Sequence, residues 1–398
     1  MKIVIQTLLA SMVLWGVAFA AGDDFSRHDP KSEIVLDHSP WSKFLRTAVY
    51  DVGFSNREPA PRRVSGKQTG GRLIAGSKSK YRHEGNRILF RLFDEGAIAY
   101  VAAYREGVQQ AVAQVGYENL NRDEQLAFWL NLYNAVVIHE IAKAHPIPQP
   151  AKIRIDGQKK RLFDAKLVVV NGVSLSLNEI RREIVFKYWQ DPAVAYGFWH
   201  GTIGGPSIQA EAYTGRNLDR VLKRAGREFV NSLRGVSRSG RPVRVSKLYE
   251  DAKGYFAVWP TDLYDHLDTL ADGQTAGLIE GRPANLRAKI YDPHTADLES
   301  GEIFHPISPL SPAALAGTNL PQILAGNRLV SNASTRGLSR DALKFIREVE
   351  IRREERETSV ELEDIEPLTL EVAPVDTADE SDEDSSDTES DEATADSD

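Results

Sequence analysis

Residues 122–146 read RDEQLAFWLNLYNAVVIHEIAKAHP, and this stretch decides the fold. Apolar side chains cover most of the circumference of a helix drawn through it, leaving a narrow polar side formed by Gln125, His139, Glu140 and Lys143. A helix that is apolar on nearly all sides is covered by other parts of the protein rather than by water. We therefore predict a central, buried helix over residues 122–144.

Two amide side chains, Asn131 and Asn134, fall on the apolar part of this helix. A buried amide must find hydrogen-bond partners, and most buried polar side chains bond to backbone. We expect both to hold the backbone of a neighbouring loop. The alternative, that one of them polarises a substrate, stays open, so both are candidate pocket residues.

The segments before the central helix predict two further helices. Ser39-Pro40 begins an amphipathic helix that carries Trp41, Phe44, Leu45 and Ala48 on one face. A basic loop rich in Gly and Pro follows, and we then expect a helix over 84–113 with a possible break.

The segments after it predict hairpins and more helices. Asp156-Gly157 and Asn171-Gly172 are the strongest short hairpin signals, each flanked by β-forming residues. Residues 176–179 form a capping box that starts a helix through about Tyr188, and another helix is expected over 217–233. Helices and hairpins alternate without regular β-α-β spacing, which predicts an α+β fold. Its central helix would pack against a small, largely antiparallel sheet of hairpins in a single main domain.

Composition changes along the chain give the expected organisation. We predict a signal peptide over 1–20, an N-terminal helix and basic loop over 21–83, the main domain over 84–272, an irregular wrapping segment over 273–338, a charged helix over 339–360 and a disordered acidic tail over 361–398. The charge is uneven: residues 361–398 hold 17 Asp or Glu and no Lys or Arg, whereas residues 1–360 hold 40 acidic and 49 basic residues. Leu343, Ile346 and Val349 form the expected packing stripe of the charged helix.

The N-terminus predicts export. Lys2 precedes an apolar run that ends in Ala18-Phe19-Ala20, the pattern of a secretory signal with a small-residue cleavage site. A bacterial periplasm is the expected location, and no membrane span is expected after cleavage. An uncleaved anchor is the alternative, since the run is nearly long enough to span a bilayer. Export and the acidic tail argue against a nucleic-acid partner.

Cysteine is absent from all 398 residues. This excludes thiol catalysis, thiolate metal sites and disulfides. The histidines show no paired spacing typical of a metal site, so we expect no metal and no cofactor.

The loop GFWHGTIGGPSIQAEAYTG, residues 197–215, holds the candidate site residues. Ser207, His200 and Glu211 are candidates for a serine nucleophile, its base and the orienting acid, with glycine amides as oxyanion donors. The stretch lacks both the Gly-x-Ser-x-Gly elbow and the P-loop pattern. As a binding pocket it would use Trp199, Gly204 and Gly205.

Five stretches together resemble the domain of unknown function 547 family: DHSPWSKFL, DEQLAFWLNLYNAVVIH, VVVNGVSLSLNEI, EAYTGRNLDRVLKRAGREFVN and VRVSKLYE. The resemblance covers about residues 33–256. It implies a typically exported bacterial protein of a family with no established common activity, which has partner-binding relatives in plants.

The loop departs from the family pattern. The resemblance implies a histidine and two cysteines here, an arrangement that looks like a thiol site. Laid on this sequence without gaps, the histidine falls at Ala195 and the cysteines at His200 and Gly205, and only Pro206 is kept. We therefore expect a non-catalytic protein that binds an unknown protein or small ligand through the altered pocket. A serine hydrolase using Ser207 with His200 and a structural component of the cell envelope are the alternatives.

Overall fold

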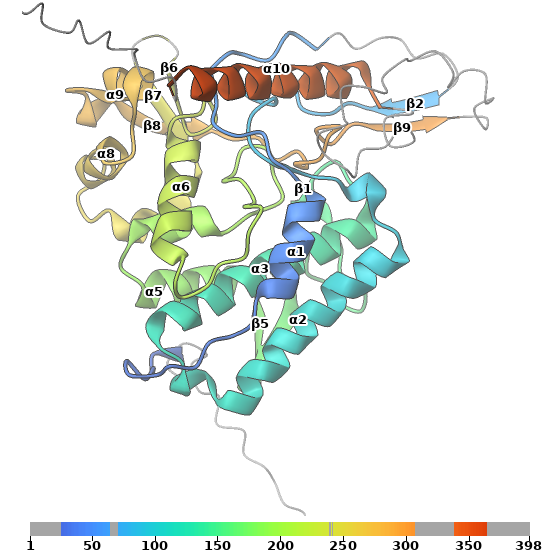
Figure 1. The fold of residues 1–398 in the computed structure, drawn as a ribbon, viewed down its shortest axis with the longest axis vertical. Coiled ribbons are helices and arrows are strands. Elements are labelled where there is room, and N and C mark those ends of the chain that lie inside the picture. The colour runs from blue at the N-terminus through green and yellow to red at the C-terminus, as the bar shows by residue number, and fades with distance from the viewer. Residues whose placement is uncertain (1–24, 64–70, 239, 241, 307–337, 364–398) are drawn as a thin grey trace, which may run out of the picture. The chain divides into compact units, whose positions relative to one another are not determined.

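Figure 1 shows the fold, a computed structural model that describes residues 25–63, 71–238, 240, 242–306 and 338–363. The chain divides into two compact units, residues 1–350 and 351–398. The expected signal peptide and most of the acidic tail lie outside the described residues. Within the described ranges, no helix combines the length and the apolar character needed to cross a bilayer.

The first unit contains short helices and strands around one long central helix. Its helices and the one that continues into the second unit are α1 Ser39–Ala48, α2 Glu95–Val115, α3 Arg122–Ala144, α4 Leu177–Glu179, α5 Phe186–Tyr188, α6 Leu218–Val230, α7 Leu248–Asp251, α8 Thr261–Asp268, α9 Gly273–Ile279 and α10 Arg340–Glu363. Its strands are β1 Val49–Tyr50, β2 Gly71–Ile74, β3 Arg87–Ile88, β4 Lys166–Val170, β5 Val173–Ser176, β6 Val236–Arg238, β7 Val243–Ser246, β8 Leu286–Ile290 and β9 Ile303–Pro306.

The strands form small separate sheets. Three antiparallel pairs, β1–β3, β2–β9 and β4–β5, accompany a three-stranded sheet in the order β6-β7-β8, in which only the β7–β8 pair is parallel. The mixture of helices with small, largely antiparallel sheets confirms the predicted α+β class.

The central helix α3 spans the predicted residues (Figure 1), and most of its side chains are buried. Asn121 caps its first turn by accepting a hydrogen bond from the Glu124 N–H. Two of the four residues on the side predicted to be polar, Gln125 and Glu140, are buried too, whereas His139 is partly buried and Lys143 is exposed. Gln125 is fully buried and donates to the carbonyls of Arg27 and Tyr117, while the buried Glu140 pairs with Arg105 at 3.0 Å. These partners come from other segments, so the helix needs no polar side facing water.

The helix predicted over 84–113 begins eleven residues later than expected. Helix α2 starts at Glu95, where the Asp94 side chain accepts a hydrogen bond from the Ala97 N–H. The preceding residues are irregular because the buried Asn86 side chain joins two distant segments. Its amide accepts from Val52 N and donates to the Ile208 carbonyl. These tertiary bonds outweigh the helical periodicity of residues 84–94.

The turn signals gave mixed results. Asn171 and Gly172 both adopt positive φ, 51° and 76°, and join β4 to β5 as predicted. The Asp156-Gly157 turn closes only one isolated bridge, between Arg154 and Arg161. The capping box is present, and the helix it starts reaches Tyr188 through a π-helical turn over Ile180–Val185.

Two further apolar clusters complete the first unit. One joins the sheet β6-β7-β8 to α6, α8 and α9, with Tyr196 and Tyr249 at its centre. The other joins Tyr50, Val52 and Leu89 to the first turns of α10. On α10 the buried side chains among the described ones are Ala342, Phe345, Ile346 and Val349, and the predicted stripe residue Leu343 is only partly buried.

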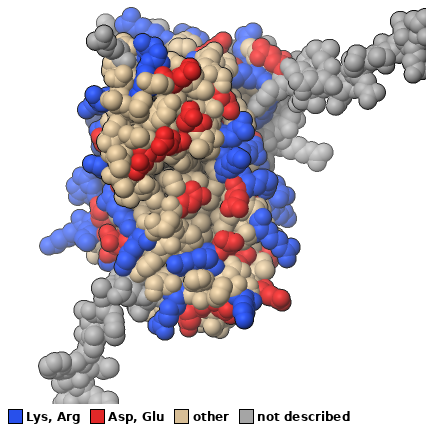
Figure 2. Space-filling view, turned by 90° about the vertical axis from the view of Figure 1, so that its left-hand side faces the viewer, with Lys and Arg blue, Asp and Glu red and all other residues tan. Residues whose placement is uncertain are grey.

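Figure 2 shows a face with much uncharged surface, on which acidic and basic residues lie in separate small groups. Basic and acidic side chains alternate there with uncharged ones. The excess of basic residues in the folded part therefore produces no continuous positive surface on this face.

Candidate functional site

Two amides of α3 fix the backbone of the loop that begins at Gly197. Asn134 donates to the Gly197 carbonyl at 3.0 Å and accepts from the Trp199 N–H at 2.9 Å. Asn131 does the same for Tyr213, donating at 2.7 Å and accepting at 3.0 Å. Both side chains are committed to backbone, and neither lines the cavity described next.

The other side of the loop is held by the segment around Asp292. The Gly204 N–H donates to the Asp292 carbonyl at 3.0 Å, and the Ile203 N–H donates to the His294 carbonyl at 2.9 Å. A β-carbon on Gly204 would lie 2.4 Å from the Asp292 nitrogen, a distance that no real contact reaches. Glycine is required at this position because the two backbones approach so closely.

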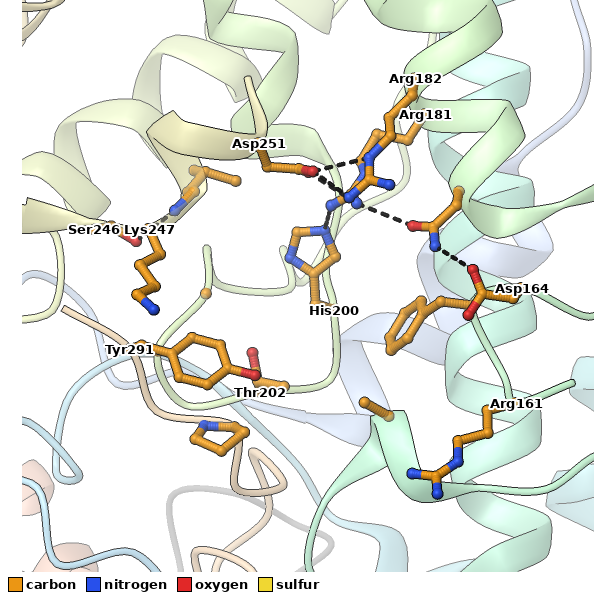
Figure 3. A pocket seen from close by; sticks show the side chains of 17 residues that line it. Arg161, Asp164, Arg181, Arg182, His200, Thr202, Ser246, Lys247, Asp251 and Tyr291 are labelled. Atoms are coloured by element: carbon orange, nitrogen blue, oxygen red, sulfur yellow. Dashed lines mark hydrogen bonds and ion pairs between the residues drawn. The ribbon is translucent and has the colours of Figure 1, made fainter. Parts of the chain in front are cut away.

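Beside this loop lies a cavity of about 380 Å³ (Figure 3). Five segments of the chain meet around it, which are residues 151–164, 178–182, 200–205, 246–251 and 291–293. Its wall is mostly apolar or aromatic, including Phe163 and the exposed ring of Tyr291. The charged or titratable side chains in the wall are Arg161, Asp164, Arg181, Arg182, His200, Lys247 and Asp251.

A chain of hydrogen bonds orders the polar side of the cavity (Figure 3). Arg181 donates to His200 Nε2, pairs with Asp251 at 2.8 Å and donates to the Asn178 side-chain oxygen at 3.1 Å. Asn178 in turn donates to Asp164 at 2.8 Å. The Asp251 carboxylate also binds Arg182.

His200 is a neutral hydrogen-bond donor in this arrangement. A guanidinium can only donate, so His200 Nε2 must accept and the ring proton must sit on Nδ1. Burial, together with the charges of Arg181 and Arg182, lowers the pKa of His200 well below 6.5. The lone pair that a general base would use is therefore occupied by Arg181.

Two cations of the cavity wall have no acidic partner among the described residues. The Arg161 side chain is exposed and makes no ion pair there. The Lys247 ammonium lies 5.4 Å from the centre of the Tyr291 ring, a cation–π contact that leaves its charge uncompensated. Both are free to meet an anion.

The three residues considered for serine catalysis lie in separate hydrogen-bond networks. The buried Ser207 hydroxyl accepts from the Asn86 N–H and from Arg234, both at 3.0 Å. Glu211 binds Arg220 through both oxygens, at 3.0 and 2.7 Å. His200 binds Arg181 instead of Ser207. The expected triad is not assembled, because each side chain is held by a different partner.

The remaining pocket candidates divide between the core and the cavity. Trp199 is buried and stacks on Phe90, away from the cavity wall. Gly204 and Gly205 do line the cavity.

Sequence reasoning missed the cations and the carboxylate that dominate the cavity. The sequence signals for these cations were the run Lys159-Lys160-Arg161 and the neighbouring arginines Arg181 and Arg182. Asp251 lies about 70 residues from its arginine partners, and nothing local indicated that pairing.

Two of the three positions at which the family resemblance implies a histidine or a cysteine lie in the cavity wall. His200 and Gly205, where the resemblance implies the two cysteines, both line the cavity. A β-carbon on Gly205 would lie 3.6 Å from His200 Nδ1. Ala195, where the resemblance implies the histidine, is buried in the separate apolar cluster around β6-β7-β8.

Comparison with known proteins gives one family. Residues 117–230 match the family described as "Protein of unknown function, DUF547". Neither the curated proteins nor the solved structures contain a match. The matched region includes α3, the loop from Gly197 and His200. Residues 117–230 of this chain are therefore similar to the DUF547 family.

Proposed function

We propose that this chain binds a small anionic ligand in the cavity around His200 and does not react with it. The observation that carries the proposal is the charge of the wall, which holds four permanent cations and two carboxylates. Asp251 is already engaged by Arg181 and Arg182, and Asp164 by Asn178. Arg161 and Lys247 have no acidic partner among the described residues, so they are the cations available to bind the anionic group of the ligand.

The chemistry of His200 supports binding rather than catalysis. Its Nε2 is occupied by Arg181, so it offers the ligand an N–H donor and no proton acceptor. The Ser207 hydroxyl is buried and bonded elsewhere. Neither side chain is arranged as an activated nucleophile or a general base.

The rest of the wall indicates the ligand's shape. Phe163 and Tyr291 contribute aromatic surface, and Ala151, Leu248 and Pro293 are apolar. A volume of about 380 Å³ falls within the range of sites for small molecules. The preferred ligand would combine a flat apolar body with a carboxylate or phosphate group.

Isothermal titration calorimetry at low salt tests the proposal, with inorganic phosphate, citrate and benzoate as probes. The double variant Arg161→Gln/Lys247→Gln should bind at least tenfold more weakly than the parent protein. Arg244 is an exposed arginine outside the cavity wall, so Arg244→Gln is the matched control and should bind as the parent does. If no probe binds, or if the control loses as much affinity as the double variant, the proposal fails.

Export of the chain is part of the same proposal. It is supported by Lys2, the apolar run and Ala18-Phe19-Ala20. Expression of the full chain in a bacterium, fractionation and N-terminal sequencing would check it. A periplasmic product that starts at Ala21 would support export, and a cytoplasmic product that retains residue 1 would refute it.

A further inference from the structure

The stretch before β4 carries an unusual concentration of positive charge. Residues 152–166 contain six basic and two acidic residues. Lys166 pairs with Glu179 at 2.6 Å. The other five make no ion pair with any described residue, and all are exposed: Lys152, Arg154, Lys159, Lys160 and Arg161. We call residues 152–161 the basic ribbon.

Hydrogen bonds and buried side chains hold the backbone of the basic ribbon in place. Arg154 and Arg161 are antiparallel bridge partners, and the Leu162 N–H donates to the Ile153 carbonyl at 3.1 Å. Ile153 and Leu162 are buried in the main core. The Gln158 side chain ties the ribbon to β4 by two hydrogen bonds to the Lys166 backbone, both 3.0 Å long.

This geometry places two positively charged side chains next to each other. Side chains of directly opposed residues lie on the same face of a β-ribbon, so the guanidinium groups of Arg154 and Arg161 are neighbours. Such a pair is destabilising unless an anion lies between its members. No described carboxylate does so. The ribbon therefore has a charge that only an external anion can compensate.

We propose that the basic ribbon binds an acidic peptide segment in an extended conformation. Alternate side chains of an extended peptide lie on one face about 6.8 Å apart, so successive carboxylates of such a peptide can reach the exposed cations of Lys159, Lys160 and Arg161. The ribbon also continues into the cavity wall through Ala151 and Arg161. A flexible chain can follow a surface that leads into a hollow, whereas a flat lipid surface cannot. This site goes beyond the small-ligand cavity and shares only Arg161 with it.

Fluorescence anisotropy with a labelled twelve-residue peptide of alternating Glu and Ser tests this inference. The triple variant Arg154→Gln/Lys159→Gln/Lys160→Gln should bind the peptide at least tenfold more weakly than the parent protein. A control triple variant, Lys80→Gln/Arg244→Gln/Lys289→Gln, removes the same charge from exposed residues outside the ribbon. It should bind within twofold of the parent.

Three results would overturn the inference. They are absence of peptide binding at low salt, an equal loss in the control variant, and phosphatidylglycerol vesicles that bind through the ribbon while the peptide does not. Phosphate binding separates the two sites, because Lys247→Gln should weaken it, whereas the triple variant, which keeps Arg161 and Lys247, should leave it unchanged. Failure of one site would then be distinguishable from failure of the other.

Discussion

Replacing Asn134 by leucine should destabilise the protein strongly, although the two side chains have the same number of heavy atoms and the same branching. Asn134 is 3% exposed, and its amide makes two bonds to the backbone, one with the Gly197 carbonyl and one with the Trp199 N–H. Leucine branches at the same carbon but can make neither hydrogen bond. Both backbone groups would be left buried without a partner.

The magnitude follows from those two groups. A buried polar group without a partner costs about 1–3 kcal/mol, which gives about 2–6 kcal/mol for the pair. Burial of the more apolar side chain returns roughly 1–2 kcal/mol. Local movement has little room to relieve the loss, since a β-carbon on Gly197 would already lie 2.8 Å from Leu130. The difference between the two contributions is about 0–5 kcal/mol, and because local movement cannot relieve the loss we expect the free energy of unfolding to fall by about 2–4 kcal/mol.

Urea unfolding followed by tryptophan fluorescence measures this loss. Asn285 is exposed and its side chain bonds to no described residue, so Asn285→Leu is the control and should change the free energy of unfolding by less than about 0.5 kcal/mol. A decrease of less than about 1 kcal/mol in the free energy of unfolding of Asn134→Leu would refute the reasoning, because two buried backbone groups left without hydrogen-bond partners should cost more than that.

Two further predictions concern pH and reactivity. Burial lowers the pKa of His38 and of His266 from 6.5 to about 4, so between these pH values the unfolded chain binds more protons than the folded protein. The stability contributed by these two histidines should be fully present above pH 6.5 and decrease towards pH 4, which urea unfolding midpoints measured across this range would check. His266→Gln should reduce the dependence of the midpoint on pH. An unchanged dependence in this variant would contradict the role given to His266. Ser207 should not react with a fluorophosphonate probe, because its hydroxyl is buried and accepts hydrogen bonds from Asn86 and Arg234. Mass-spectrometric mapping with a Ser207→Ala control measures this, and stoichiometric labelling of Ser207 would contradict the prediction.

The amino-acid sequence by itself determined the local elements. Apolar residues around most of the circumference identified α3 over its observed span. Asn171-Gly172 identified a hairpin because both residues tolerate positive φ. The capping box identified the start of the helix at Leu177. Each of these signals acts between residues a few positions apart, so it can be read without knowing the fold.

Only the tertiary structure decided which polar groups meet. Gln125 appeared solvent-facing, yet it is buried because carbonyls from Arg27 and Tyr117 receive its amide. The start of α2 moved because Asn86 bonds to residues far from it in the chain. The cavity likewise joins five segments, and its key ion pair links Arg181 to Asp251 across 70 positions. Such partners are set by how the elements pack, and local periodicity contains no information about that packing.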